Sequence, residues 1–131
     1  MKKIGVINAP ISTVIAELGH TDTLTIADAG LPIPKEVHRI DLALAKGIPG
    51  FIETLRVVLS EMKVDKVIVA DEMNQISPSI LTEVKGLIGD IPVDFVPHQR
   101  FKDLTKSSRA IIRTGEFTPY ANIILVSSVV F

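Results

Sequence analysis

The stretch Val67-Ile68-Val69-Ala70 places four apolar residues in unbroken succession, and it sets the fold class of this 131-residue chain. A strand covered on one face only alternates apolar with polar residues. Strands of a parallel sheet are buried on both faces and have continuous apolar runs instead. The stretch therefore predicts a central strand with helices packed on both sides of it.

Helical patterns flank that strand on both sides. Apolar residues recur at helical spacing over Phe51–Met62, just before the strand. After it, Ser77-Pro78 is typical of a helix N-cap followed by the first helical residue, and the apolar pattern of Ile80–Ile88 continues that helix. This alternation of helix and strand predicts an α/β fold.

The rest of the chain follows the same two spacings. We expect helices at Ile11–Leu18 and Gln99–Lys106, and strands at Thr23–Ala27, Val93–Val96, Ala110–Ile112 and Asn122–Val126. Together these elements predict one domain, residues 1–131, with three layers (α/β/α) around a mostly parallel, mixed central sheet.

Composition limits the function classes. The net charge of −1, with no basic block, lacks the positive footprint that nucleic-acid binding needs. The chain has no cysteine, which excludes disulfides, thiolate catalysis and cysteine metal sites. Met1–Val6 does not resemble a secretory signal, and no apolar run approaches the ~20 residues that cross a bilayer. We therefore expect a cytoplasmic protein that binds neither membranes nor nucleic acid.

The apolar content is high for so small a chain. Hydrophobic residues make up 47% of it, and the mean hydropathy is +0.38. Small proteins have much surface and little interior, so a surplus of apolar residues predicts that part of the surface is buried against other subunits. The alternative is a tightly packed monomer.

Polar residues follow several predicted strands where each strand ends. They are Asp28, Asp71, His98 and the run Thr114–Tyr120. In open α/β sheets, ligands bind beyond the carboxyl ends of the strands, so this placement predicts that several of these residues meet. The wider run Arg113–Asn122 carries a guanidinium, a carboxylate, a hydroxyl, a phenol and an amide. It is typical either of a small-molecule site or of a turn that needs many hydrogen bonds.

His20 has two interpretations. It directly follows Gly19 at the expected end of a helix, where an imidazolium can bond the last carbonyl groups. It also suits a general acid, because histidine changes charge near neutral pH, and Thr21 and Asp22 are placed to orient its ring.

Asp28 and His98 also have a structural and a functional interpretation. Asp28 closes a strand before a Gly/Pro-rich loop, so it suits either an Asx-turn or hydrogen bonds to ligand hydroxyls. His98 precedes a helix and suits an N-terminal cap or a second acid/base. Lys102 shares its helix face.

No metal or nucleotide motif is present. The three histidines are 18 and 60 residues apart, which matches no metal-ligand spacing, and no glycine-rich phosphate loop occurs. We therefore expect no metal and no cofactor.

Four segments together carry a resemblance to a known family. They are Gly19-His20-Thr21-Asp22, the segment Asp28–Pro34, His98-Gln99-Arg100-Phe101-Lys102, and Arg113–Asn122. In this order and spacing, over Met1–Phe131, the chain resembles the family of ribose pyranases and fucose mutarotases, which are sugar ring isomerases. It departs from the family at Ala9-Pro10 and Gln99-Arg100, outside the matched polar groups.

The resemblance implies an enzyme that interconverts the pyranose and furanose forms of D-ribose without metal or cofactor. It implies that His20 is the catalytic acid, and that Asp28, His98, Tyr120 and Asn122 bind the sugar. Ala121 would contribute only backbone, and Lys102 is a weaker candidate. It also implies a homodecameric ring. The alternatives are a mutarotase of another sugar such as fucose, a non-catalytic sugar-binding module and a structural assembly protein.

Overall fold

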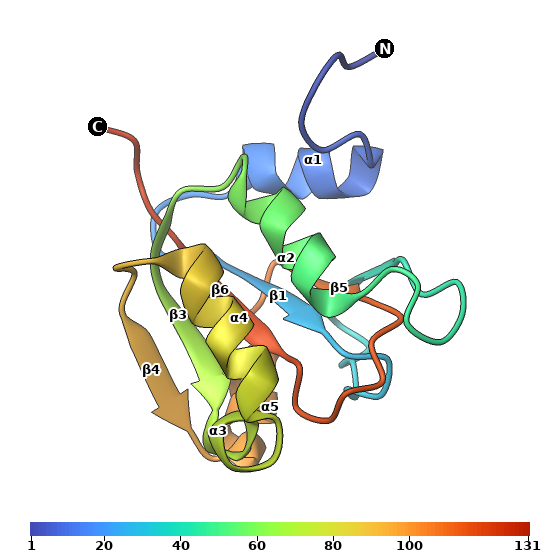
Figure 1. The fold of residues 1–131 in the computed structure, drawn as a ribbon. Coiled ribbons are helices and arrows are strands. Elements are labelled where there is room, and N and C mark those ends of the chain that lie inside the picture. Colours follow the sequence, from blue (N-terminus) through green and yellow to red (C-terminus); the bar gives the residue numbers. More distant parts are fainter.

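The structure, a computed structural model, describes all 131 residues and contains six strands and five helices (Figure 1). The strands are β1 (Thr23–Ala27), β2 (His38–Asp41), β3 (Val64–Ala70), β4 (Val93–Val96), β5 (Ala110–Arg113) and β6 (Ile123–Ser127). The helices are α1 (Ala9–Glu17), α2 (Phe51–Leu59), α3 (Asp71–Ile76), α4 (Pro78–Ile88) and α5 (His98–Thr105).

The strands form one sheet in the order β2-β5-β1-β6-β3-β4. β6 runs antiparallel to both of its neighbours, β1 and β3, and the other neighbouring pairs are parallel. The prediction of a mostly parallel, mixed sheet is therefore confirmed. Because β6 is reversed, its first residue lies at the edge where the parallel strands end.

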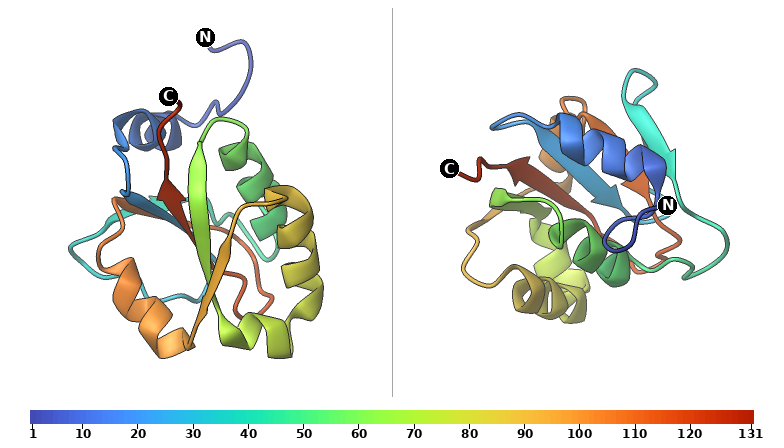
Figure 2. Two further views of the ribbon diagram at one scale, coloured as in Figure 1. Left: turned by 90° about the vertical axis from the view of Figure 1, so that its left-hand side faces the viewer. Right: turned by 90° about the horizontal axis from the view of Figure 1, so that it is seen from above.

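Helices cover both faces of this sheet, so the three predicted layers are present. Figure 2 shows α2 and α4 against one face and α5 against the other. The core under α1, α2 and α4 contains 23 buried residues, whereas the core under α5 contains 6, with Phe101 and Ile111 among them. The sheet therefore packs unequally on its two sides.

The strand that set the fold class is buried as expected. Val67, Val69 and Ala70 have no exposed surface, and Ile68 packs on the α5 side. The strand also begins three residues before the apolar run, at Val64. This first part of the strand contains the exposed, charged residues Asp65 and Lys66, so the apolar pattern of the sequence did not reveal it.

Helix α4 begins at Pro78 with Ser77 as its N-cap residue, as the sequence predicted, but the Ser77 side chain makes no capping hydrogen bond. The Ser77 hydroxyl donates instead to the carbonyl oxygen of Pro119, in the polar run. The short helix α3 was not predicted. No helix of the chain is both long enough and apolar enough to span a membrane.

Candidate functional site

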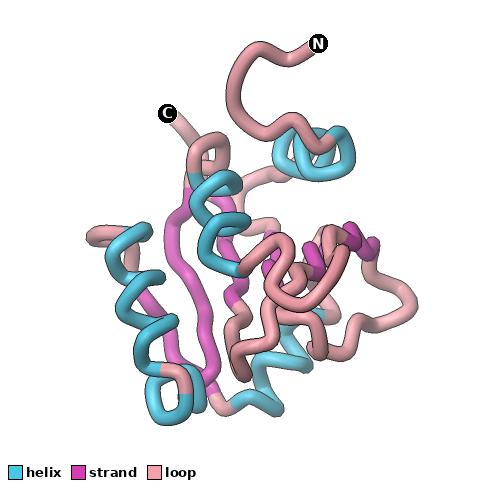
Figure 3. Tube along the Cα trace, turned by 45° about the vertical axis from the view of Figure 1, so that its right-hand side comes forward, coloured by secondary structure: helices cyan, strands magenta, loops and turns pink.

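The carboxyl edge of the parallel strands brings three of the predicted site residues together. Asp28 follows β1, His98 follows β4, and Tyr120 lies in the loop that leads into β6. All three line one hollow of about 260 Å³. Figure 3 shows the loops that leave the ends of the strands, and these loops hold the site.

Asp28 and Asn122 hold each other in place. The Asp28 backbone N–H donates to Asn122 Oδ1 at 2.8 Å, and Asn122 Nδ2 donates to Asp28 Oδ2 at 3.0 Å. Asn122 is 1% exposed, so its amide sits beneath the hollow rather than in it. The other Asp28 oxygen accepts the Gly30 N–H at 2.9 Å, which is the Asx-turn that the sequence left open. A fixed carboxylate therefore faces the hollow.

His98 packs between two aromatic rings. It stacks on Phe101 and meets Tyr120 edge to face, with ring centroids 6.2 and 5.0 Å away. Burial and then the Lys102 ammonium lower the pKa of His98 below its usual value, so the ring is neutral at pH 7. Its Nδ1 is buried and has no hydrogen-bond partner. An N–H there would be left unsatisfied, which favours the tautomer with the proton on Nε2.

A second residue fixes the position of His98. Both oxygens of the Glu72 carboxylate accept the His98 backbone N–H, at 3.0 and 3.3 Å. Glu72 comes from α3, so this helix caps the start of α5. The interpretation of His98 as the N-terminal cap of this helix is therefore wrong, because the Glu72 carboxylate, and not the His98 side chain, accepts the hydrogen bond there.

The loop before β6 combines shape with hydrogen bonding. Tyr120 has a φ of 62°, a left-handed conformation that non-glycine residues seldom adopt, and Ala121 beside it is fully buried. The Glu116 carboxylate accepts the backbone N–H groups of Phe51 and Thr118 and the Thr118 hydroxyl. Glu116 thus has a structural role, although it also lines a second hollow beside Asp28.

His20 is not part of this cluster. It precedes β1, whereas Asp28 follows it, and the five residues of β1 alone span about 16 Å. His20 lines a different hollow, with Ser128 and Phe131 from the C-terminal tail. Its Nε2 lies 2.9 Å from Asp65 Oδ2. The helix-capping interpretation is wrong, because no hydrogen bond joins His20 to α1.

Comparison with known proteins places this arrangement in a family. Residues 1–130 match the model of the RbsD / FucU transport protein family. A D-ribose pyranase of Coprothermobacter proteolyticus is 55% identical over 131 residues, which is all of both chains. The chain belongs to the RbsD / FucU family.

Solved structures of RbsD / FucU proteins have the same fold. Bacillus subtilis RbsD complexed with D-ribose has a TM-score of 0.97 and 46% identity over the whole of both chains. The fucose mutarotase of Streptococcus pneumoniae, in complex with L-fucose, has a TM-score of 0.78 and 25% identity over the whole of both chains. This RbsD / FucU chain thus has structural relatives of both kinds, with ribose and with fucose bound.

Sequence reasoning missed two site residues of this RbsD / FucU chain, Glu72 and Asp65. Each contacts a histidine far away in the sequence, so no local spacing signals it. The predicted orienting residues of His20 were wrong: Asp22 accepts the Gly19 N–H and pairs with Arg109 instead, and the Thr21 hydroxyl makes no hydrogen bond. Lys102 lies on α5 near His98 but outside the hollow.

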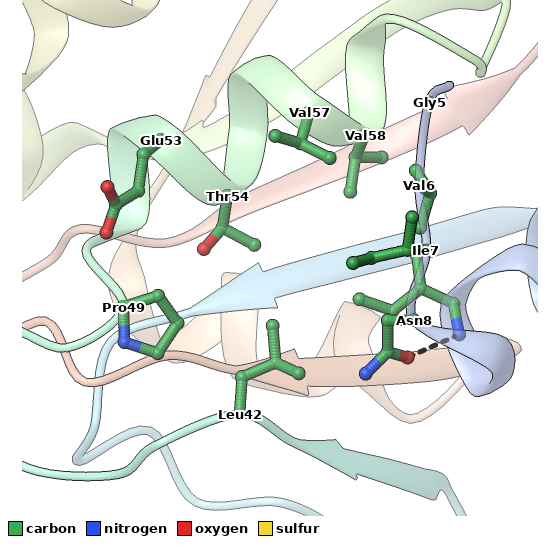
Figure 4. Close-up of a pocket in the computed structure, with 11 residues that line it drawn as sticks. Gly5, Val6, Ile7, Asn8, Leu42, Pro49, Glu53, Thr54, Val57 and Val58 are labelled. Atoms are coloured by element: carbon green, nitrogen blue, oxygen red, sulfur yellow. Dashed lines mark hydrogen bonds between the residues drawn. The ribbon is translucent and has the colours of Figure 1, made fainter. Parts of the chain in front are cut away.

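A larger hollow lies elsewhere in the molecule. It measures about 450 Å³ and is bounded by the N-terminal segment, α2 and the Leu42 region (Figure 4). Its lining is mostly apolar and contains none of the predicted site residues. Size alone therefore does not identify the site in this protein.

Proposed function

We propose that this chain catalyses the interconversion of the pyranose and furanose forms of D-ribose. The observation that carries the proposal is the hollow at the carboxyl edge of the sheet, where Asp28, His98 and Tyr120 meet. Its volume of about 260 Å³ suits a monosaccharide. The full-length identity with D-ribose pyranases and the likeness to ribose-bound RbsD support ribose as the substrate.

The reaction needs proton transfer and hydrogen bonds that hold the hydroxyl groups of the sugar. A cyclic hemiacetal opens when its ring oxygen gains a proton and its anomeric hydroxyl loses one, and the aldehyde recloses through a different hydroxyl. Histidine suits this role near neutral pH, and general acid–base catalysis typically contributes ~10²–10⁴-fold. We assign His20 to protonating the ring oxygen.

The residues that line the hollow are suited to bind the hydroxyl groups of the sugar. The Asp28 carboxylate accepts hydrogen bonds from sugar hydroxyls, and the Tyr120 ring offers an apolar wall and a phenol. With its proton on Nε2, His98 donates to a sugar oxygen. A bound water then takes the proton that leaves the anomeric hydroxyl. Asn122 acts through Asp28, which it holds, and Ala121 contributes backbone alone.

His20 and the hollow must then come from different subunits. One chain cannot bring His20 to a sugar held by Asp28, because β1 separates them. A second copy, packed with its β1 start against this chain's hollow, supplies the missing histidine. A contact that joins two different surfaces closes into a ring when the rotation between successive copies closes.

Exposed apolar side chains at both ends of the sheet support that packing. Val130 and Phe131, beside His20, are 84% and 102% exposed, and Phe117, beside Asp28, is 60% exposed. Exposed apolar side chains that lie together in one patch mark surfaces that contact other molecules. The decameric ring and the cytoplasmic location both remain predictions.

Exchange spectroscopy tests the proposed function. NMR follows exchange between the anomeric signals of ribose, with and without the protein, and the same measurement on fucose compares the two substrates. We expect faster exchange for ribose than for fucose. A preference for fucose would make the chain a mutarotase of that sugar. Ribose binding without faster exchange would make it a non-catalytic binding module.

A further inference from the structure

The His20 side chain is held by a residue that no sequence motif identifies. Its Nε2 lies 2.9 Å from Oδ2 of Asp65, which is on β3. β6 separates β1 from β3 in the sheet, so the two side chains reach toward each other across the end of β6. This contact is long-range both in sequence and in the sheet.

The backbone on both sides of the pair is fixed to β6 and the tail behind it. The Thr21 N–H donates to the carbonyl oxygen of Ser127 at 2.9 Å, and the Ser128 N–H donates to that of Lys63 at 2.9 Å. Thr21 has a φ of 71°, which is rare for a β-branched residue. Unfavourable backbone conformations of this kind cluster at functional sites, where the surrounding structure maintains them.

Asp65 is well suited to receive an N–H. The Ser128 hydroxyl, and then the His20 imidazole, lower the pKa of the Asp65 carboxyl, so it is ionised at neutral pH. Lys63 and Glu61 are the other charged side chains beside this hollow. No other side chain makes a hydrogen bond to the His20 ring, and Nδ1 is left without a partner.

We propose that Asp65 is the positioning residue of His20, and that His20 exchanges its proton with the sugar at Nδ1. The Asp65 carboxylate accepts the Nε2–H and so fixes both the ring orientation and the tautomer. In the imidazolium, Nδ1 then carries the proton that passes to the ring oxygen. After that transfer the neutral ring keeps its proton on Nε2, and Nδ1 has the lone pair for the return step. This inference rests on the proposed ring isomerisation.

The variant Asp65→Asn tests the role of the carboxylate. Its side-chain amide can donate to Nε2 and thereby favour the wrong tautomer. We expect kcat for ribose exchange to fall about tenfold or more, a part of the ~10²–10⁴-fold that acid–base catalysis contributes. KM should change less, because Asp65 does not touch the sugar-binding hollow. Asp65→Glu, which keeps a carboxylate, should recover much of the rate.

Asp94→Asn is the matched control. Asp94 forms a similar exposed ion pair on the sheet, with Lys66 at 2.8 Å, and it does not contact His20. We expect it to leave kcat unchanged. Equal rates for Asp65→Asn, Asp94→Asn and the unaltered protein would overturn the inference.

A second readout reports the tautomer directly. Nitrogen-15 NMR of the neutral His20 ring in the unaltered protein should show the proton on Nε2, and Asp65→Asn should weaken that preference. A proton on Nδ1 in the unaltered protein would overturn the inference, even if Asp65→Asn failed to fold. If the unaltered protein does not accelerate ribose exchange, the proposed function is wrong, whereas this spectrum still reports on the pair.

Discussion

His20 and Asp28 lie at opposite ends of the same strand, β1, although only seven residues separate them in the sequence. Both are exposed to hollows, but the hollows are different. Two residues assigned to one reaction are therefore too far apart to serve it within one chain. This separation leads to the most specific prediction about the assembly.

Two inactive variants should restore activity when they assemble together. His20→Ala lacks the proposed catalytic acid, and Asp28→Asn lacks the carboxylate of the hollow. If each site combines two copies, about a quarter of the sites in a random mixed assembly contain both intact residues. We expect ribose exchange in coexpressed variants, measured by NMR, to recover toward that fraction.

The control for this experiment is a mixture of the two variants that are purified separately and kept from exchanging subunits. It should remain inactive. If the coexpressed variants are also inactive while both retain the native assembly, His20 and Asp28 do not act across a subunit contact.

Removing the Asn122 amide should destabilise the fold as well as the site. In Asn122→Ala, the Asp28 N–H loses its acceptor and Asp28 Oδ2 loses a donor in a partly buried setting. Leaving such groups unsatisfied costs about 1–3 kcal/mol in the free energy of unfolding. Denaturant unfolding measures this change. The exposed Asn74→Ala on α3 is the control and should lie within about 0.5 kcal/mol of the unaltered protein.

His98 should make stability depend on pH. Its pKa in the folded protein is below the usual value of 6.5, so the unfolded chain binds more protons as the pH falls past that value. The stability from neutral, packed His98 is present above 6.5 and is lost as the pH falls through the lowered pKa. Thermal unfolding should show a drop in Tm across this window.

The comparison variants for this effect are His98→Gln and His38→Gln. His98→Gln should lower Tm at neutral pH but remove much of the further loss on acidification. His38 is an exposed residue of β2, so its replacement should leave the pH dependence unchanged. An unchanged pH profile in His98→Gln would mean that other groups cause the acid loss.

Two glycines should respond to alanine in opposite directions. A Cβ at Gly115 would lie 2.5 Å from the backbone oxygens of Ala45 and Ile48, so Gly115→Ala should cost about 1–3 kcal/mol of stability. Gly86 lies within α4 with open space around it, so Gly86→Ala should stabilise the protein by about 0.5–1 kcal/mol. Denaturant unfolding measures both. An unchanged free energy of unfolding in Gly115→Ala would show that the loop can move aside.

The apolar patterns of this chain were sufficient to predict the layers of its fold. The spacing of apolar residues predicted strands such as Val67–Ala70 and helices such as Ile80–Ile88. This spacing is a property of each short segment, so it can be seen in the sequence alone. The placement of Asp28 and His98 after strands also predicted their meeting, because parallel strands end at one edge. The reversed strand β6 then brought Tyr120 to that edge.

Only the tertiary structure revealed the side-chain contacts between those elements. Local sequence suggested Asp22 for His20 and the His98 side chain for its own helix, but Asp65 and Glu72 hold these residues across the fold. The family resemblance implied a sugar contact for Asn122, and this contact remains a prediction; the structure adds that its amide is buried and holds Asp28. Hydrogen bonds between distant side chains follow from sheet order and register, which no local pattern records. For the same reason, only the folded chain showed that His20 and Asp28 are separated by the length of β1.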